Sequence, residues 1–173
     1  AWPMFDASIA GPIIAVVTGS GLAPLRSLLQ ARVAALKGSG HGGVNGALTG
    51  YVGLPISLFV GHRPMDIDII DETLADATNA GVLDIVSIVP SNPEGVRVQD
   101  KLLEFGIAEK IAEKLRHPEC RVFVCANFVA ANATARNLSI LLSEDIKSLF
   151  MDRYIEEIYG VAVSDEGATS CRI

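Results

Sequence analysis

A strand, a glycine turn and a helix follow one another between residues 12 and 32, and this unit constrains the fold most strongly. Ile13–Val17 is a short, wholly apolar run, which is typical of a buried parallel strand. Gly19 and Gly21 allow a tight turn with no side chain above it. Pro24 suits the first position of a helix, and leucines recur behind it at helical spacing. The free N–H groups of that helix therefore face the turn, which predicts a phosphate-binding site.

The glycine turn departs from the common dinucleotide-binding fingerprint. Pro24 stands where a third glycine is usual, and the next expected strand, Ile56–Val60, is followed by Gly61-His-Arg63 instead of an acid. Many α/β proteins carry a glycine turn between a strand and a helix. This stretch alone therefore leaves both phosphate binding and a purely structural turn open.

Composition limits the class of protein. The 173 residues are expected to form a single domain, residues 1–173, with a substantial core. Half of the residues are hydrophobic and mean hydropathy is +0.38, yet no apolar run is long enough to span a membrane. The net charge of −6 argues against nucleic acid as a partner. Three cysteines without a CxxC motif favour a reducing compartment, so we expect a cytoplasmic protein without a signal peptide.

Strand-like and helix-like segments alternate along the chain. Gly38–Gly53 is rich in glycine and lacks an apolar period, which predicts a mobile loop. Tyr154–Tyr159 suits either a helix or a fifth strand. The alternation predicts an α/β fold with three layers, a doubly wound, Rossmann-like parallel sheet of about five strands. Expected strands are Ile13–Val17, Ile56–Val60, Leu83–Val89 and Arg121–Cys125, and expected helices are about Pro24–Lys37, Ile67–Asn79, Arg97–Leu115 and Ala130–Lys147.

The carboxyl ends of these strands should meet at one edge of the sheet, where such folds bind ligands. They carry a glycine turn, a cation, small hydroxyl and amide groups and one thiol, without paired carboxylates or a Ser-His-Asp order. The three histidines fall in unrelated elements, so no metal site is expected, and the acids of residues 66–72 are more typical of a helix start. This edge predicts binding of a polar ligand. The segments are Thr18-Gly-Ser-Gly21, Gly61-His-Arg63, Pro90-Ser-Asn92 and Cys125-Ala-Asn127.

Several motifs occur in an order that is found in one known family. They are Gly19-Ser-Gly-Leu-Ala-Pro24 with Arg26–Arg32, Leu58-Phe-Val-Gly-His-Arg63, Val96-Arg-Val-Gln-Asp-Lys-Leu102, Arg121-Val-Phe-Val-Cys-Ala-Asn127 and Arg153-Tyr-Ile-Glu-Glu-Ile-Tyr159. Over about residues 5–159 the chain resembles the NADP-binding module of the ferredoxin–NADP reductase superfamily, in particular of diflavin reductases of the cytochrome P-450 reductase type.

The resemblance implies a role for individual positions. Residues expected to bind the cofactor are Gly19, Ser20, Gly21, Pro24, Arg63, Ser91, Asn92, Arg97, Gln99 and Asn127. The positions that match the family's binding site for the 2′-phosphate are Ser91, Asn92, Arg97 and Gln99. Residues expected to assist catalysis are Ser20, Cys125 and Glu157, which surround the nicotinamide, and Tyr159, which matches an aromatic shield of the flavin.

Some positions depart from the family pattern. Asn92 replaces an arginine, Gly95 replaces a lysine and Arg97 replaces an aromatic residue, which leaves one cation where several are usual. NADPH is therefore only weakly favoured over NADH. A tail, Gly160–Ile173, follows Tyr159, where the family's chains normally end.

Nothing in the chain resembles a flavin-binding domain. The resemblance implies an NADP(H)-binding module that passes hydride from NADPH to FAD on a separate or missing domain, with FMN expected further on. Expected partners are that flavin-binding domain and a downstream electron acceptor such as a haem protein, without nucleic acid or membrane contact from this segment. The module should be inactive alone, and a longer parent chain, with a membrane tether elsewhere in it, remains open. The alternative is a non-catalytic nucleotide-binding or protein-interaction relic of the same fold.

Overall fold

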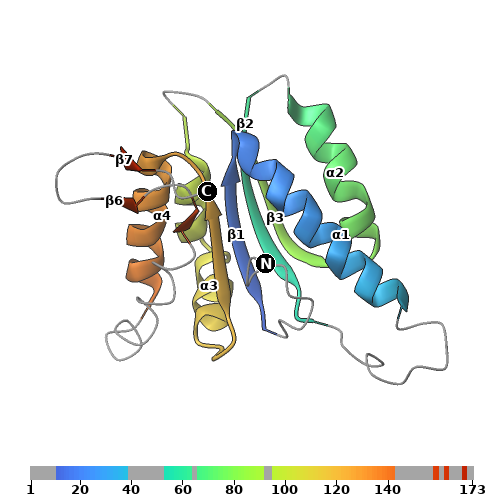
Figure 1. Cartoon of the computed structure of the whole chain (residues 1–173). Coiled ribbons are helices and arrows are strands. Elements are labelled where there is room, and N and C mark those ends of the chain that lie inside the picture. Colours follow the sequence, from blue (N-terminus) through green and yellow to red (C-terminus); the bar gives the residue numbers. More distant parts are fainter. Residues whose placement is uncertain are drawn as a thin grey trace.

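The computed structural model describes residues 11–38, 53–63, 66–91 and 95–142, together with short strands at 158–159, 162–163 and 169–170. A five-stranded sheet has the order β3-β2-β1-β4-β5, and each neighbouring pair is parallel (Figure 1). From β1 the chain builds outward through β2 to β3, then returns to the other side of β1 with β4. This reversal confirms the predicted doubly wound α/β sheet. The strands are β1 Ile13–Thr18, β2 Ile56–His62, β3 Leu83–Pro90, β4 Arg121–Cys125 and β5 Ile158–Tyr159.

Helices cover both faces of the sheet, so the molecule has three layers (Figure 1). One face is covered by α1 and α2, and the other by η4, α3 and α4. Alternate residues of β1 point to the two sides: Ala15 and Val17 pack with α1 and α2, whereas Ile14 and Val16 pack with α3 and α4. Burial on both faces explains why the strand is a continuous apolar run. The helical elements are η2 Gly19–Gly21, α1 Leu22–Gly38, α2 Ile67–Asn79, η4 Val98–Leu103, α3 Ala108–Leu115 and α4 Phe128–Leu141.

The single helix predicted over Arg97–Leu115 is wrong. The structure has a 3₁₀ helix, η4, followed by a turn and then the shorter helix α3. Gly106 has φ +78°, which is incompatible with a right-handed helix, and it divides the two segments. Apolar residues recur at helical spacing on both sides of this glycine, so the sequence pattern concealed the break.

Other boundaries also differ from the predictions. The first helix begins at Leu22 and not at Pro24, because the glycines before it form a 3₁₀ turn that leads directly into α1. The second strand continues beyond Val60 to His62. The predicted helix Ala130–Lys147 begins earlier and ends earlier, as α4. Its start is fixed by Asn127, whose side chain accepts a hydrogen bond from the Ala130 N–H at 3.0 Å. Leu142, with ψ 137°, has extended backbone and ends the helix.

The last part of the chain is described only in short pieces. Ile158 and Tyr159 form β5, parallel to β4, which is the strand alternative for Tyr154–Tyr159. Within the predicted tail, β6 (Ala162–Val163) pairs antiparallel with β7 (Thr169–Ser170). The prediction of a mobile loop over Gly38–Gly53 concerns residues 39–52, which lie outside the described residues.

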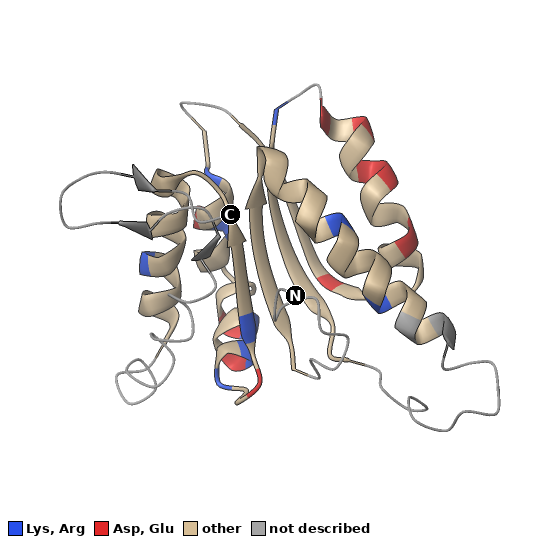
Figure 2. Ribbon diagram, viewed as in Figure 1, with Lys and Arg blue, Asp and Glu red and all other residues tan. Residues whose placement is uncertain are grey.

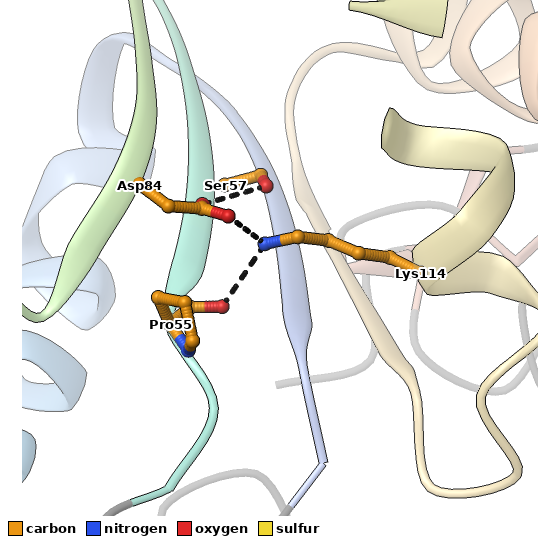
Figure 3. Close-up of polar contacts among 4 residues, drawn as sticks. All are labelled: Pro55, Ser57, Asp84 and Lys114. Carbon is orange, nitrogen blue, oxygen red and sulfur yellow. Dashed lines mark hydrogen bonds and ion pairs between the residues drawn. The ribbon is translucent and has the colours of Figure 1, made fainter. Parts of the chain in front are cut away.

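A polar cluster joins the amino ends of β2 and β3 to α3 (Figure 3). Lys114 Nζ lies 2.5 Å from Asp84 Oδ2 and donates a hydrogen bond to the Pro55 carbonyl at 3.2 Å. The Ser57 hydroxyl donates to Asp84 Oδ1 at 3.0 Å. This cluster lies at the end of the strands opposite the glycine turn. It therefore stabilises the sheet edge and plays no part in the candidate site.

Charge is distributed unevenly over the helices. Figure 2 shows acidic residues along α2, where Asp68, Asp71, Glu72 and Asp76 are exposed. The middle of the sheet carries almost no charge (Figure 2). Over the part of the chain that the structure describes, no helix is long and apolar enough to cross a membrane.

Candidate functional site

The glycine turn after β1 lies against the end of β4, at the point where the strand order reverses. Val17 pairs with Cys125 in the β1–β4 register. A Cβ atom added to Gly21 would lie 2.5 Å from the Cys125 carbonyl oxygen and 3.1 Å from its Sγ. Only glycine fits this contact without displacing β4. The turn and the thiol of Cys125 are thus held together at the position where folds of this topology bind ligands.

The backbone of the turn faces open space on its other side. Gly19 has φ +54°, and a Cβ atom added there would meet nothing within 4 Å. Ser20 is exposed beside it, whereas Pro24 is half-buried in the first turn of α1 and has no N–H group. The first turn of α1 carries no acidic residue that would compete with an anion. An open glycine turn at a helix N-terminus fits the phosphate group of a nucleotide.

Two segments that each carry an arginine meet at the next part of the edge. Gly61 allows η4 to approach the end of β2, because its added Cβ would lie only 3.2 Å from Val98 Cγ1. Arg97 immediately precedes Val98, and Arg63 follows Gly61 by two residues. Both arginines are exposed. The contact between β2 and η4 therefore brings two segments that are far apart in the sequence, each with an exposed arginine, to the same part of the edge.

The same local structure holds the backbone of each arginine. The Arg63 N–H donates to Asp66 Oδ2 at 3.4 Å, and its carbonyl accepts from the Asp66 N–H at 2.9 Å. The Arg97 N–H likewise donates to Asp100 Oδ2 at 3.1 Å, and its carbonyl accepts from the Asp100 N–H at 3.0 Å. Arg97 is the N-cap of η4, and Arg63 lies before Asp66, the N-cap of α2. In both cases an aspartate three residues later holds the backbone of the arginine.

Other predicted cofactor-binding residues already have structural roles. Ser91 is exposed just beyond β3, and its N–H donates to the His62 carbonyl at 2.6 Å. Gln99 is buried, with 8% of its surface exposed, and its backbone carbonyl accepts a hydrogen bond from the Asn137 side chain at 2.9 Å. Asn127 caps α4, as described above. Ser91 and Asn127 are thus exposed, whereas Gln99 is buried.

The predicted catalytic residues are described only in part. Cys125 is half-buried at the end of β4, and Tyr159 pairs with it in the β4–β5 register. The backbone of Tyr159 therefore lies beside the thiol-bearing residue, at the same edge as the exposed Ser20. Glu157 and the predicted phosphate ligand Asn92 lie outside the described residues.

The chemistry offered by this edge is that of binding. Among the residues that the structure describes, no group of three histidine, cysteine, aspartate or glutamate side chains lies close enough to hold a metal ion. The edge instead combines backbone N–H groups, two guanidinium groups, small hydroxyls and a thiol. Groups of these kinds suit an anionic ligand.

Sequence reasoning missed one residue at this edge. His62 is buried, with 7% of its surface exposed, and its Nδ1 lies 2.8 Å from the Arg63 carbonyl oxygen. From the sequence it was placed in the Gly61-His-Arg63 segment of the predicted edge but was given no role of its own. The alternation of β2 was the signal available, because Leu58, Val60 and residue 62 share the face of the strand that α1 and α2 cover.

The chain is similar in sequence to parts of much longer proteins. It is 30% identical over 165 residues to the inducible nitric oxide synthases of Cavia porcellus and Homo sapiens. It is 31% identical over 158 residues to a self-sufficient cytochrome P450 monooxygenase of Penicillium freii. Each alignment covers 86% of this chain but only 13% of the relative. No family model matches the chain.

Proposed function

We propose that this chain is the NADP(H)-binding module of a flavin-dependent reductase. The observation that carries the proposal is the open glycine turn at the start of α1, held against Cys125 where the strand order reverses. Arg63 and Arg97 extend the same edge with positive charge. This combination suits a long anionic ligand, with phosphates at one part of the edge and an apolar ring near the thiol.

The similarities support the same reading. Two kinds of larger protein, named as a nitric oxide synthase and as a self-sufficient cytochrome P450 monooxygenase, share a segment like this chain. A segment that makes up a small part of different larger proteins suits a task that those proteins share, such as cofactor binding. We propose that the flavin, and the electron acceptor beyond it, belong to other domains or to a partner.

Each part of the edge has a proposed role. The glycine turn and the N-terminus of α1 bind the pyrophosphate, Arg63 binds a nucleotide phosphate, and Arg97 with Ser91 reads the 2′-phosphate. When bound, the nicotinamide supplies hydride. Cys125 and Ser20 orient that ring from this chain, while Glu157 and Tyr159 complete the site from the segment that leads into β5.

Titration calorimetry with NADP⁺ and NAD⁺ tests the proposal. We expect the 173-residue chain to bind NADP⁺ weakly, because a flavin would complete the nicotinamide half of the site. Binding of neither nucleotide at millimolar concentration would reject the cofactor-binding role and favour a non-catalytic interaction module.

A second experiment addresses catalysis. A flavin-binding reductase domain supplied in the same chain should restore hydride transfer from NADPH, followed as flavin bleaching in stopped flow. Cys125→Ala should slow that step and leave the dissociation constant for NADP⁺ nearly unchanged. If the variant transfers hydride at the parent rate, Cys125 has no role in orienting the nicotinamide.

A further inference from the structure

His62 connects the two segments of the edge that carry proposed phosphate ligands. It is the last residue of β2, and the alternation of the strand assigns it to the same face as Leu58 and Val60, which α1 and α2 cover. Its carbonyl accepts a hydrogen bond from the Ser91 N–H at 2.6 Å, which ties the end of β3 to the end of β2. Its side chain reaches the next residue, Arg63, at 2.8 Å.

The side-chain contact determines the position of one proton. Nδ1 of His62 faces the carbonyl oxygen of Arg63, and a carbonyl oxygen only accepts hydrogen bonds. Nδ1 must therefore carry a hydrogen and donate it. His62 has 7% of its surface exposed, so this bond satisfies a polar group of a buried residue.

The carbonyl of Arg63 is consequently held from two sides. It accepts from His62 Nδ1 and from the Asp66 N–H at 2.9 Å, while the Arg63 N–H contacts the Asp66 carboxylate. Aspartate also holds Arg97 in this way, but the histidine bond is described only for Arg63. The additional donor restrains the backbone from which the Arg63 side chain extends.

We infer that His62 is a positioning residue for the phosphate-binding Arg63, acting through the Nδ1–H bond to the Arg63 carbonyl. This inference rests on the proposed nucleotide-binding function. His62 does not touch the ligand. Its side chain holds the backbone of Arg63, which carries the cation. Its backbone carbonyl accepts from the Ser91 N–H and so holds the segment of Ser91 beside that of Arg63.

Two substitutions separate the donor from the bulk of the ring. His62→Asn keeps an N–H donor at nearly the same place as Nδ1, whereas His62→Leu fills the space without a donor. We expect His62→Leu to weaken NADP⁺ binding about threefold to tenfold, the range for one lost hydrogen bond, and His62→Asn to stay within about twofold of the parent chain. Ser57→Ala is the matched control, because this buried residue lies at the other end of the same strand. It should leave NADP⁺ affinity unchanged.

A double-variant cycle shows whether the effect passes through Arg63. In an Arg63→Ala background, His62→Leu should cause no further loss of NADP⁺ affinity beyond about twofold. An equal loss in both backgrounds, or no loss in the parent chain, would overturn the inference while the nucleotide-binding function stands. If the parent chain binds no nucleotide, both fail together.

A ligand-free measurement keeps the inference testable even if a variant unfolds. Long-range ¹H–¹⁵N spectra of the parent chain report which ring nitrogen of each histidine carries a proton. We expect Nδ1 of His62 to be protonated. An Nδ1 that lacks its proton, with the hydrogen on Nε2, would contradict the bond on which the inference depends.

Discussion

At the scale of single residues, the candidate site depends on how backbone atoms are held. Arg63 and Arg97 are both surface cations, and an exposed arginine would ordinarily sample many orientations. Here an aspartate three residues later bonds the N–H of each arginine. The backbone is therefore fixed before any ligand arrives, which lowers the entropy lost on binding.

Substitution of Arg97 tests whether this edge distinguishes the two nicotinamide nucleotides. Arg97→Ala should weaken NADP⁺ binding by about 1.5–3 kcal/mol, the value of a hydrogen bond to a charged group, and leave NAD⁺ binding nearly unchanged. Arg116→Ala removes the same charge from an exposed position beyond α3, at the opposite end of the molecule, and serves as the control. Equal losses for both nucleotides in calorimetry would mean that Arg97 does not read the 2′-phosphate.

The contact between Gly21 and Cys125 gives a prediction about stability. Gly21→Ala places a methyl group 2.5 Å from the Cys125 carbonyl oxygen, so β1 and β4 must separate at their ends. We expect the free energy of unfolding to fall by about 1–3 kcal/mol, as for overpacked cores, in urea denaturation. Ser20→Ala, in the same turn but exposed, should change it by less than about 0.5 kcal/mol. Equal stability of both variants would show that the turn is not packed against β4.

At the residue scale, some roles could be predicted from the sequence and others could not. The glycine turn was identified because a buried strand before it and a helix after it leave few other conformations. His62 was missed because its partner is a backbone carbonyl, which no side-chain motif records. Gln99 was expected to face the phosphate, yet it belongs to η4 and is buried there, since the 3₁₀ geometry of that segment was not foreseen.

At the scale of helices and strands, packing on both faces of the sheet explains which predictions succeeded. The boundaries of α2 and β4 agree with the predicted ranges, and β3 differs by one residue at its end. Buried parallel strands are continuous apolar runs, so they stand out from the amphipathic helices between them. The connection from β3 to β4 was predicted less well, because periodicity cannot show that Gly106 has a positive φ.

The break at Gly106 should be essential to the fold. Gly106→Ala forces a residue with a Cβ into the left-handed region at φ +78°, which costs about 1–2 kcal/mol of stability. Thermal or urea unfolding measures that loss. If the substitution stabilises the chain, the segment prefers the continuous helix that its periodicity suggests, and the division into η4 and α3 is wrong.

The cluster around Lys114 should stabilise the edge formed by β3. Its ammonium group, 13% exposed, bonds Asp84 and the Pro55 carbonyl (Figure 3). Lys114→Met keeps the aliphatic packing but removes both bonds, and we expect a loss of about 1–2 kcal/mol in the free energy of unfolding. Lys110→Met, on the exposed side of the same helix, should be nearly neutral. A neutral Lys114→Met would mean that the cluster contributes nothing to the stability of this edge.

At the scale of the whole molecule, the stabilising Lys114 cluster and the proposed binding edge lie at opposite ends of the sheet. The Lys114 cluster crosslinks the amino ends of the strands, and the glycine turn, the two arginines and Cys125 gather at the carboxyl ends. The chain spans about 13% of the length of the curated relatives that it matches. In our account this module supplies a binding edge, and a flavin on another domain would complete the reaction.

The most direct test of this account is an NMR titration of the ¹⁵N-labelled chain with NADP⁺. We predict that amide shifts will concentrate at Gly19–Gly21, Arg63, Ser91 and Cys125, where the turn, the cations and the thiol meet. The amides of Ser57 and Asp84, at the opposite end of the strands, should remain unchanged. Shifts that map to the amino ends of the strands or to the outer face of α2, or no shifts at millimolar NADP⁺, would contradict the central claim that this edge binds a nicotinamide nucleotide.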